Sequence, residues 1–131
     1  MIKIFSNIIP FEGFLAMTVW PFVFVRKELR EKYTATVDRH ENIHAEQQKE
    51  VLLVAIVLIM ATAVWTGSAW ALMWLPLYFY LYIGEWLLRL AFGDNDAYRH
   101  ISFEMEAYNH EDEPCYLQQR VPFNWLFFKL F

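Results

Sequence analysis

The sequence has little cysteine and no excess of basic residues. Cys115 is the only cysteine, so an internal disulfide and a cysteine-based zinc cluster are both excluded. The 11 lysines and arginines are outnumbered by 15 acidic residues, which gives a formal net charge of −4. A chain without a basic surface is not expected to bind nucleic acid.

Charge is also nearly absent from residues 51–92, where Glu85 and Arg89 are the only charged residues. Their spacing of four lets them pair on a helix, which lowers the cost of burying them. Apolar residues make up 57% of the 131-residue chain, more than a soluble domain of this size needs. Because a helix crosses a bilayer in about 20 residues, the stretch predicts two membrane crossings with a turn at residues 66–68. The soluble alternative is a buried helical hairpin inside a larger complex.

A histidine motif stands just before this stretch, where residues 40–44 read H-E-x-x-H. On a helix, His40 and His44 lie one turn apart on one face, so both imidazoles can bind the same metal ion. Zinc fits because neutral imidazole and carboxylate are its ordinary ligands. Glu41 lies beside that face and could take a proton from a water molecule. The alternative interpretation is a solvated polar turn that happens to carry two histidines.

A catalytic zinc site usually has three protein ligands, and a second polar segment offers candidates for the third. Residues 103–107 read F-E-x-E-A and contain Glu104 and Glu106. These two lie about 200° apart around a helix, so only one of them can face the histidines. His100, one turn before Glu104, is either a further ligand or a polar surface residue.

The two motifs resemble those of the gluzincin class of membrane metallopeptidases, which includes HtpX and the prenyl-protein-processing proteases. In that class the third ligand comes from an E-x-x-A-D helix, and residues 104–107 match its E-x-x-A part. The resemblance implies that Glu104 is the third ligand. It departs at Tyr108, where the class carries an aspartate that supports the metal ligands by hydrogen bonding without itself binding the metal. The whole chain also resembles short uncharacterised membrane-associated proteins of Bacteroidetes.

Basic residues flank the apolar stretch, whereas the turn near Gly67 has none. They are Arg26, Lys27, Arg30, Lys32, Arg39 and Lys49 before it and Arg89, Arg99, Arg120 and Lys129 at or after its end. By the positive-inside rule, both ends of the stretch face the cytoplasm. We therefore expect a multi-pass protein of the inner (cytoplasmic) membrane with its metal site on the cytoplasmic side.

The N-terminal third permits two interpretations. Residues 8–25 are apolar apart from Glu12 but are interrupted by proline and glycine, which allows a third, re-entrant membrane helix. We favour an interfacial segment followed by a β-hairpin in which residues 20–25 pair with residues 33–37. A strand beside the metal-binding helix could hold an extended peptide by main-chain hydrogen bonds. The start of the chain does not read as a cleaved signal peptide.

Helix ends follow from a few local signals. Asp38 is expected to cap the first long helix, with Glu41 completing a capping-box-like arrangement. Gly93 is expected to end the second apolar helix, and a third helix starting at residues 94–96 carries Glu104. The aromatic tail, residues 121–131, is expected to be an interfacial anchor.

Several polar residues are open to more than one interpretation. The acidic run at residues 111–113 reads as solvated surface. Gln47 and Gln48 extend the histidine helix, either to orient a substrate or as neutral interface residues. Arg89 or Arg99 could stabilise a charged intermediate.

The sequence therefore predicts a single, mainly α-helical, membrane-associated zincin-like domain over residues 1–131. Residues 1–37 would form the interfacial segment and short β-hairpin. Residues 38–92 would form the H-E-x-x-H helix and a transmembrane helical hairpin in contact with membrane lipids. Residues 93–131 would supply the third-ligand helix and the tail.

Two classes of function fit these features. The first is a minimal zinc-dependent membrane metallopeptidase with His40, His44 and Glu104 as ligands and Glu41 as catalytic base. It would hydrolyse a peptide or membrane-protein substrate near the cytoplasmic membrane interface. The second is a non-catalytic zincin-like membrane subunit that binds metal or a larger protein complex, which the small size favours. Glu41 favours the first, because a purely structural metal site needs no general base.

Overall fold

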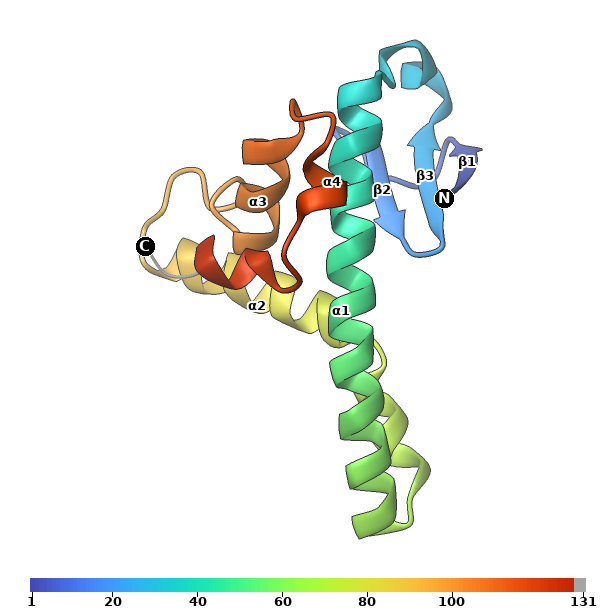
Figure 1. The fold of residues 1–131 in the computed structure, drawn as a ribbon, viewed down its shortest axis with the longest axis vertical. Helices are drawn as coiled ribbons and strands as arrows, with labels where there is room; N and C mark the ends of the chain where they lie inside the picture. Colours follow the sequence, from blue (N-terminus) through green and yellow to red (C-terminus); the bar gives the residue numbers. More distant parts are fainter. Residues whose placement is uncertain (129–131) are drawn as a thin grey trace.

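Three short strands near the N-terminus form a small sheet in the computed structural model, which describes residues 1–128 (Figure 1). The strands are β1 (Ile2–Ser6), β2 (Ala16–Val19) and β3 (Phe22–Arg26). Their order is β1-β3-β2, with β1 parallel and β2 antiparallel to the central strand. Val23 and Val25 of that central strand are fully buried, so β3 anchors the sheet and β2 forms one of its edges.

The predicted β-hairpin is present, but its predicted partner strand is wrong. Residues 22–26 pair with β2, which precedes them, and residues 33–37 instead lead into the long helix. The charged residues between them form a 3₁₀ helix, η1 (Lys27–Lys32). Residues 8–25 contain β2 and most of β3, so the alternative of a membrane helix there is wrong as well.

The long helix α1 (Ala35–Thr66) begins earlier than predicted because Thr34 caps it. The Thr34 hydroxyl accepts a hydrogen bond from the Val37 N–H at 3.4 Å. Asp38 lies inside the first turn, where a carboxylate is favourable to the helix dipole, and it accepts a bond from the Tyr33 hydroxyl at 3.0 Å. The predicted capping role of Asp38 and Glu41 is therefore wrong, and Glu41 is free for another role.

The apolar half of α1 extends away from the rest of the fold as an arm (Figure 1). The helix ends at Gly67, whose φ of 61° is left-handed and favours glycine, so the predicted turn is confirmed. The chain then returns along α1 as a 3₁₀ helix, η2 (Ala69–Trp74). We refer to residues 51–75 as the arm.

Helix α2 (Leu77–Ala91) does not run along α1 but begins next to it at the base of the arm and runs away from it to one side (Figure 1). It ends before Gly93, which has a left-handed φ of 78° as predicted. Within residues 1–128, α1 is the only helix long and apolar enough to cross a membrane. The second membrane crossing, and with it a transmembrane hairpin, is not confirmed.

The C-terminal segments pack on the opposite side of α2 from the arm (Figure 1). They are α3 (Ser102–His110), α4 (Tyr116–Gln119) and η3 (Asn124–Phe128). The apolar core joins Val51, Tyr78, Ile101, Phe103 and Trp125. Helix α3 starts later than predicted, because residues 95–101 form turns. The fold is thus mainly helical, with a small N-terminal sheet.

The aromatic tail is partly built into this core rather than being a free anchor. The Trp125 ring lies 4.4 Å from the Phe103 ring, and its indole N–H donates to Glu50 at 3.2 Å. Phe127, by contrast, is 81% exposed. The last part of the predicted anchor, residues 129–131, lies outside the described residues.

Candidate metal centre

Two helices bring the predicted ligands together. His40 and His44 lie one turn apart on α1 with their Nε2 atoms 3.1 Å from each other. Helix α3 places the Glu104 carboxylate over both, at 3.3 Å from each Nε2 atom. All three residues are buried, and each offers one ligand atom within 4.8 Å of the other two.

The other nitrogen of each imidazole is held by a hydrogen-bond acceptor. His40 Nδ1 lies 2.8 Å from a carboxylate oxygen of Glu111, and His44 Nδ1 lies 2.9 Å from the side-chain oxygen of Gln47. Because both partners are acceptors, each Nδ1 carries a proton, so in its neutral form each imidazole presents the Nε2 lone pair. Both lone pairs therefore point into the space that Glu104 faces.

This arrangement suits a cation. Three acceptor atoms converge there, and Glu104 Oε2 is buried without receiving a hydrogen bond from the described residues. Such a cluster is unfavourable unless a proton or a metal ion lies between the acceptors. Ligand atoms about 2.0–2.1 Å from a tetrahedral zinc ion would lie about 3.3 Å apart. The two Nε2 atoms lie 3.1 Å apart, and each lies 3.3 Å from a different oxygen of the Glu104 carboxylate. His40, His44 and Glu104 could thus hold a metal ion, and their donor atoms are of the kinds that zinc binds.

Glu104 is held in its ionised form. Burial raises the pKa of this carboxyl group, but the adjacent His44 and His40 imidazoles, when protonated, outweigh burial and hold the pKa well below its usual value. The Tyr82 hydroxyl also donates to Glu104 Oε1 at 2.5 Å. The carboxylate is therefore charged and oriented before any metal binds.

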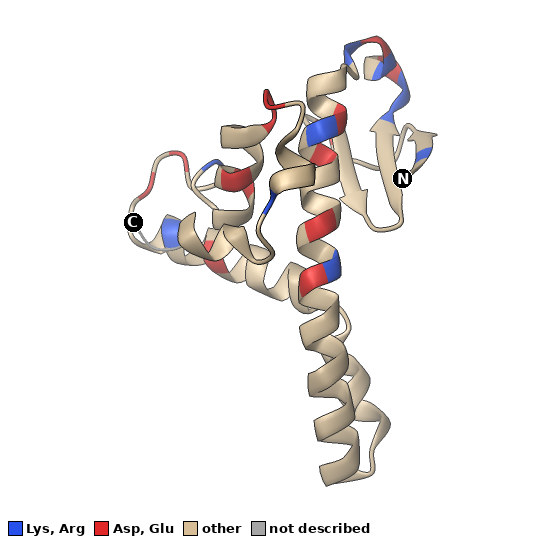
Figure 2. Cartoon of the chain, viewed as in Figure 1, with Lys and Arg blue, Asp and Glu red and all other residues tan. Residues whose placement is uncertain are grey.

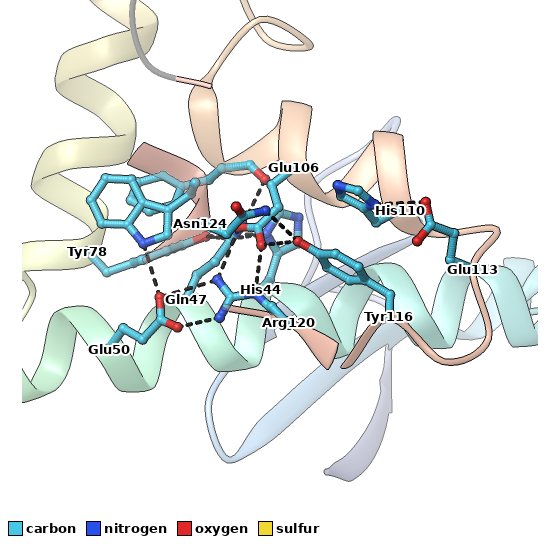
Figure 3. Close-up of polar contacts among 12 residues, drawn as sticks. His44, Gln47, Glu50, Tyr78, Glu106, His110, Glu113, Tyr116, Arg120 and Asn124 are labelled. Carbon is cyan, nitrogen blue, oxygen red and sulfur yellow. Dashed lines mark hydrogen bonds and ion pairs between the residues drawn. The ribbon is translucent and has the colours of Figure 1, made fainter. Parts of the chain in front are cut away.

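Glu106, the rival third ligand, faces away from the histidines. It is fully buried and accepts hydrogen bonds from Tyr116 at 2.7 Å and from Arg120 at 2.6 Å. It also accepts one from the Gln47 amide at 2.9 Å, so that the Gln47 oxygen is left to face His44 (Figure 3). Glu106 therefore supports the site through Gln47 rather than binding the metal.

Glu41 is fixed by the edge strand of the sheet. The Thr18 hydroxyl on β2 lies 2.6 Å from Glu41 Oε2 and 3.2 Å from the Glu41 main-chain oxygen. Thr18 and Glu41 are both buried. The contact aims the Glu41 carboxylate into the same space as the histidines, since all of these residues line one cleft.

That cleft has a volume of about 480 Å³ and lies between β2 and α2. Most of its wall is apolar or aromatic, and its polar residues are gathered at the candidate metal centre. The apolar and aromatic lining residues are Pro10, Phe11, Phe14, Ala16, Met17, Tyr78, Phe79, Tyr82, Ile83, Trp86 and Tyr98. A cleft of this kind accommodates an apolar ligand with its reactive group beside the histidines.

Other residues considered from the sequence lie outside the centre. His100 pairs with Asp94 at 2.8 Å and is exposed, so it is not a ligand. Arg89 pairs with Glu85 at 2.8 Å, and Arg99 lies over the Tyr108 ring at 4.4 Å. None of the three lines the cleft.

Two supporting residues were missed by the sequence interpretation. Glu111 was assigned to solvated surface, yet it lies seven residues after Glu104, which places it two turns on along the same side of a helix. Gln47 lies three residues after His44, a spacing at which side chains on a helix meet. Spacing from the proposed ligands would have identified both.

No known protein family, curated protein or solved structure matches this chain. The resemblance to gluzincins therefore rests on residues 40–44 and 104–107 alone.

Proposed function

We propose that the chain is a small zinc-dependent peptidase of gluzincin type that acts at a membrane surface. The observation that carries this proposal is the convergence of His40 Nε2, His44 Nε2 and the Glu104 carboxylate within 3.1–3.3 Å of one another. A zinc ion bound there would supply Lewis acidity toward a peptide carbonyl and an acidic water molecule.

Glu41 is the proposed general base. Its carboxylate lines the cleft beside the histidines and is held by Thr18 at 2.6 Å. From this position it would take a proton from water during attack on the carbonyl and return it to the leaving amine. Tyr82 and Glu111 would keep Glu104 and His40 in place meanwhile.

The edge strand supports a peptide as substrate. The Arg26 N–H donates to the Leu15 carbonyl, so Leu15 faces β3. Because successive residues of a strand face opposite edges, the main-chain N–H and C=O groups of Ala16 and Thr18 point to the other edge of β2. The Gln48 side-chain amide donates to the Thr18 carbonyl at 2.7 Å, so that carbonyl already has a partner, whereas Ala16 lines the cleft. An extended peptide could pair there, with apolar side chains against the aromatic wall.

We further propose that the centre faces the cytoplasm at the inner membrane. The basic side chains all lie outside the arm, with a concentration on η1 and the start of α1 (Figure 2). The positive-inside rule places such a segment on the cytoplasmic side. A peptide or a segment of a membrane protein would then reach the cleft from the bilayer surface.

The alternative is a non-catalytic zincin-like subunit of a larger complex. The exposed apolar residues of the arm and α2 favour it, because a protein partner could cover them. It would keep the metal without needing Glu41 as a base.

The test measures zinc content and peptide hydrolysis on the full chain purified in detergent. The wild type is expected to hold about one zinc per chain and to cleave fluorogenic peptides rich in apolar residues. His40→Ala should lose both properties, whereas His100→Ala, which changes an exposed histidine outside the centre, should keep both. A wild type without zinc at any supplied concentration would overturn the proposal.

A further inference from the structure

Helix α2 carries an exposed apolar stripe along its whole length. Tyr80, Ile83, Leu87 and Leu90 are spaced three and four residues apart, and each is 46–54% exposed. This spacing places them on one face of the helix. The opposite face holds Tyr78, which is buried in the core.

The only charged residues of α2 face the protein instead. Glu85 accepts hydrogen bonds from the Ser102 hydroxyl at 2.6 Å and from the Ser102 N–H at 3.0 Å. Arg89 pairs with Glu85 at 2.8 Å. Both charges are thus satisfied on the α3 side of the helix, and the exposed stripe carries none.

The arm, like the stripe on α2, is apolar and uncharged, and it lies on the same side of the fold as the stripe. The sequence contains no charged residue between Glu50 and Glu85, and the whole arm is free of charge in Figure 2. Trp65 is 90% exposed and Trp70 is 75% exposed. Tyr78, on the opposite face of α2 from the stripe, packs with Phe103 of α3, so the stripe points away from α3. The arm extends from that same side of α2 (Figure 1), and neither the arm nor the stripe carries a charge.

The direction of α2 argues against a second membrane crossing, and the length of the arm favours insertion from one side. Residues 51–66 of α1 extend about 24 Å, which is shorter than the bilayer hydrocarbon core of about 30 Å. Because α2 runs away from α1 to one side at the base of the arm (Figure 1), it lies across the direction of the arm. If the arm enters a bilayer along its normal, α2 lies along the bilayer surface.

We propose that this face docks on a lipid bilayer, with the arm inserted from one side and α2 lying flat in the interface. Lipid fits better than a protein partner, because protein interfaces normally exchange a hydrogen bond for every 100–200 Å² or so. The exposed face offers almost only apolar side chains. Tyr80 and Trp86 on α2, both partly exposed, suit the headgroup region. The proposal does not depend on the metal centre.

Depth measurements with spin labels test this orientation. Cys115 is first replaced by serine, and single cysteines are then placed at Tyr80, Leu87 and Leu90, which are exposed and thus tolerant of change. The full chain is reconstituted in vesicles of phosphatidylcholine and phosphatidylglycerol. Trp65→Cys reports the arm, and Glu28→Cys on η1 is the aqueous control.

A flat helix gives the three α2 labels equal depth near the headgroups, with Trp65→Cys deepest and Glu28→Cys in water. A crossing helix would separate Tyr80→Cys and Leu90→Cys by about 15 Å, which would overturn the proposal. Labels that all remain in water would overturn it in favour of a protein partner. Repeating the series with His40→Ala separates the two proposals, because loss of zinc should leave the depths unchanged.

Discussion

Glu111 accepts a hydrogen bond from His40 Nδ1 at 2.8 Å, although 71 residues separate the two in the sequence. The resemblance to gluzincins assigns this supporting role to an aspartate at the position of Tyr108. Here the Tyr108 ring lies 4.6 Å from the His40 ring, and the carboxylate comes from one turn later. A supporting carboxylate is therefore present despite the departure from the motif.

The first prediction concerns this contact. Glu111→Ala should lower zinc affinity about 10–100-fold, because a supporting carboxylate orients the ligand and raises its basicity. Glu111→Gln should lower the zinc affinity less, since it keeps a hydrogen-bond acceptor. Competition with a chelator measures the affinity, and Asp112→Asn on the exposed neighbour is the control. Equal affinities for Glu111→Ala and wild type would assign Glu111 to the surface.

The second prediction separates Glu104 from Glu106. Glu104→Gln should remove stoichiometric zinc and leave the chain folded. Glu106→Gln should instead lower thermal stability, because it leaves the buried Arg120 with Glu50 as its remaining carboxylate partner. Losing one member of a buried ion pair costs about 3–5 kcal/mol. Zinc content and unfolding temperature are measured for both. Zinc loss in a stable Glu106→Gln variant, with stoichiometric zinc kept by Glu104→Gln, would reverse the assignment.

Local rules predicted the features that depend on short stretches of sequence. The helical spacing of His40 and His44 and the end of the helix at Gly67 each follow from a few neighbouring residues. The pairing of β3 with β1 and β2 does not, because strand pairing joins distant residues and residues 33–37 have an equally suitable composition.

The orientation of α2 could not be predicted from the sequence for a different reason. Hydropathy averages over a helix, so it does not distinguish a membrane-crossing helix from one whose charges, Glu85 and Arg89, all face the protein. Glu111 was missed for a similar reason, since an acidic run reads as solvated surface unless its spacing from Glu104 is considered.

The third prediction tests the contact between β2 and the proposed base. Thr18→Val removes the hydroxyl that lies 2.6 Å from Glu41 with little change in volume. We expect hydrolysis to fall roughly tenfold, since a lost buried hydrogen bond costs about 1–3 kcal/mol, while zinc content stays unchanged. Thr18→Ser retains the hydroxyl and should restore most of the rate. Equal rates for the valine and serine variants would show that Thr18 does not position Glu41.

The last prediction distinguishes the peptidase from the non-catalytic subunit through Glu41. Glu41→Gln keeps the size of the side chain and an acceptor for Thr18 but removes the base. A general base contributes roughly 10²–10⁴-fold to a rate, so hydrolysis should fall by that factor while zinc content and unfolding temperature hold. Kinetics on an apolar fluorogenic peptide, together with elemental analysis of the same preparation, measure this.

His40→Ala gives the matched comparison, since it removes a ligand instead of the base. If the chain is a peptidase, His40→Ala loses zinc and activity, whereas Glu41→Gln loses activity alone. If Glu41→Gln behaves like wild type in cells while His40→Ala fails, the metal has a structural role and the subunit assignment holds. Because Glu41 is not among the ligand atoms that converge at the centre, a fall in zinc content with Glu41→Gln would contradict both assignments.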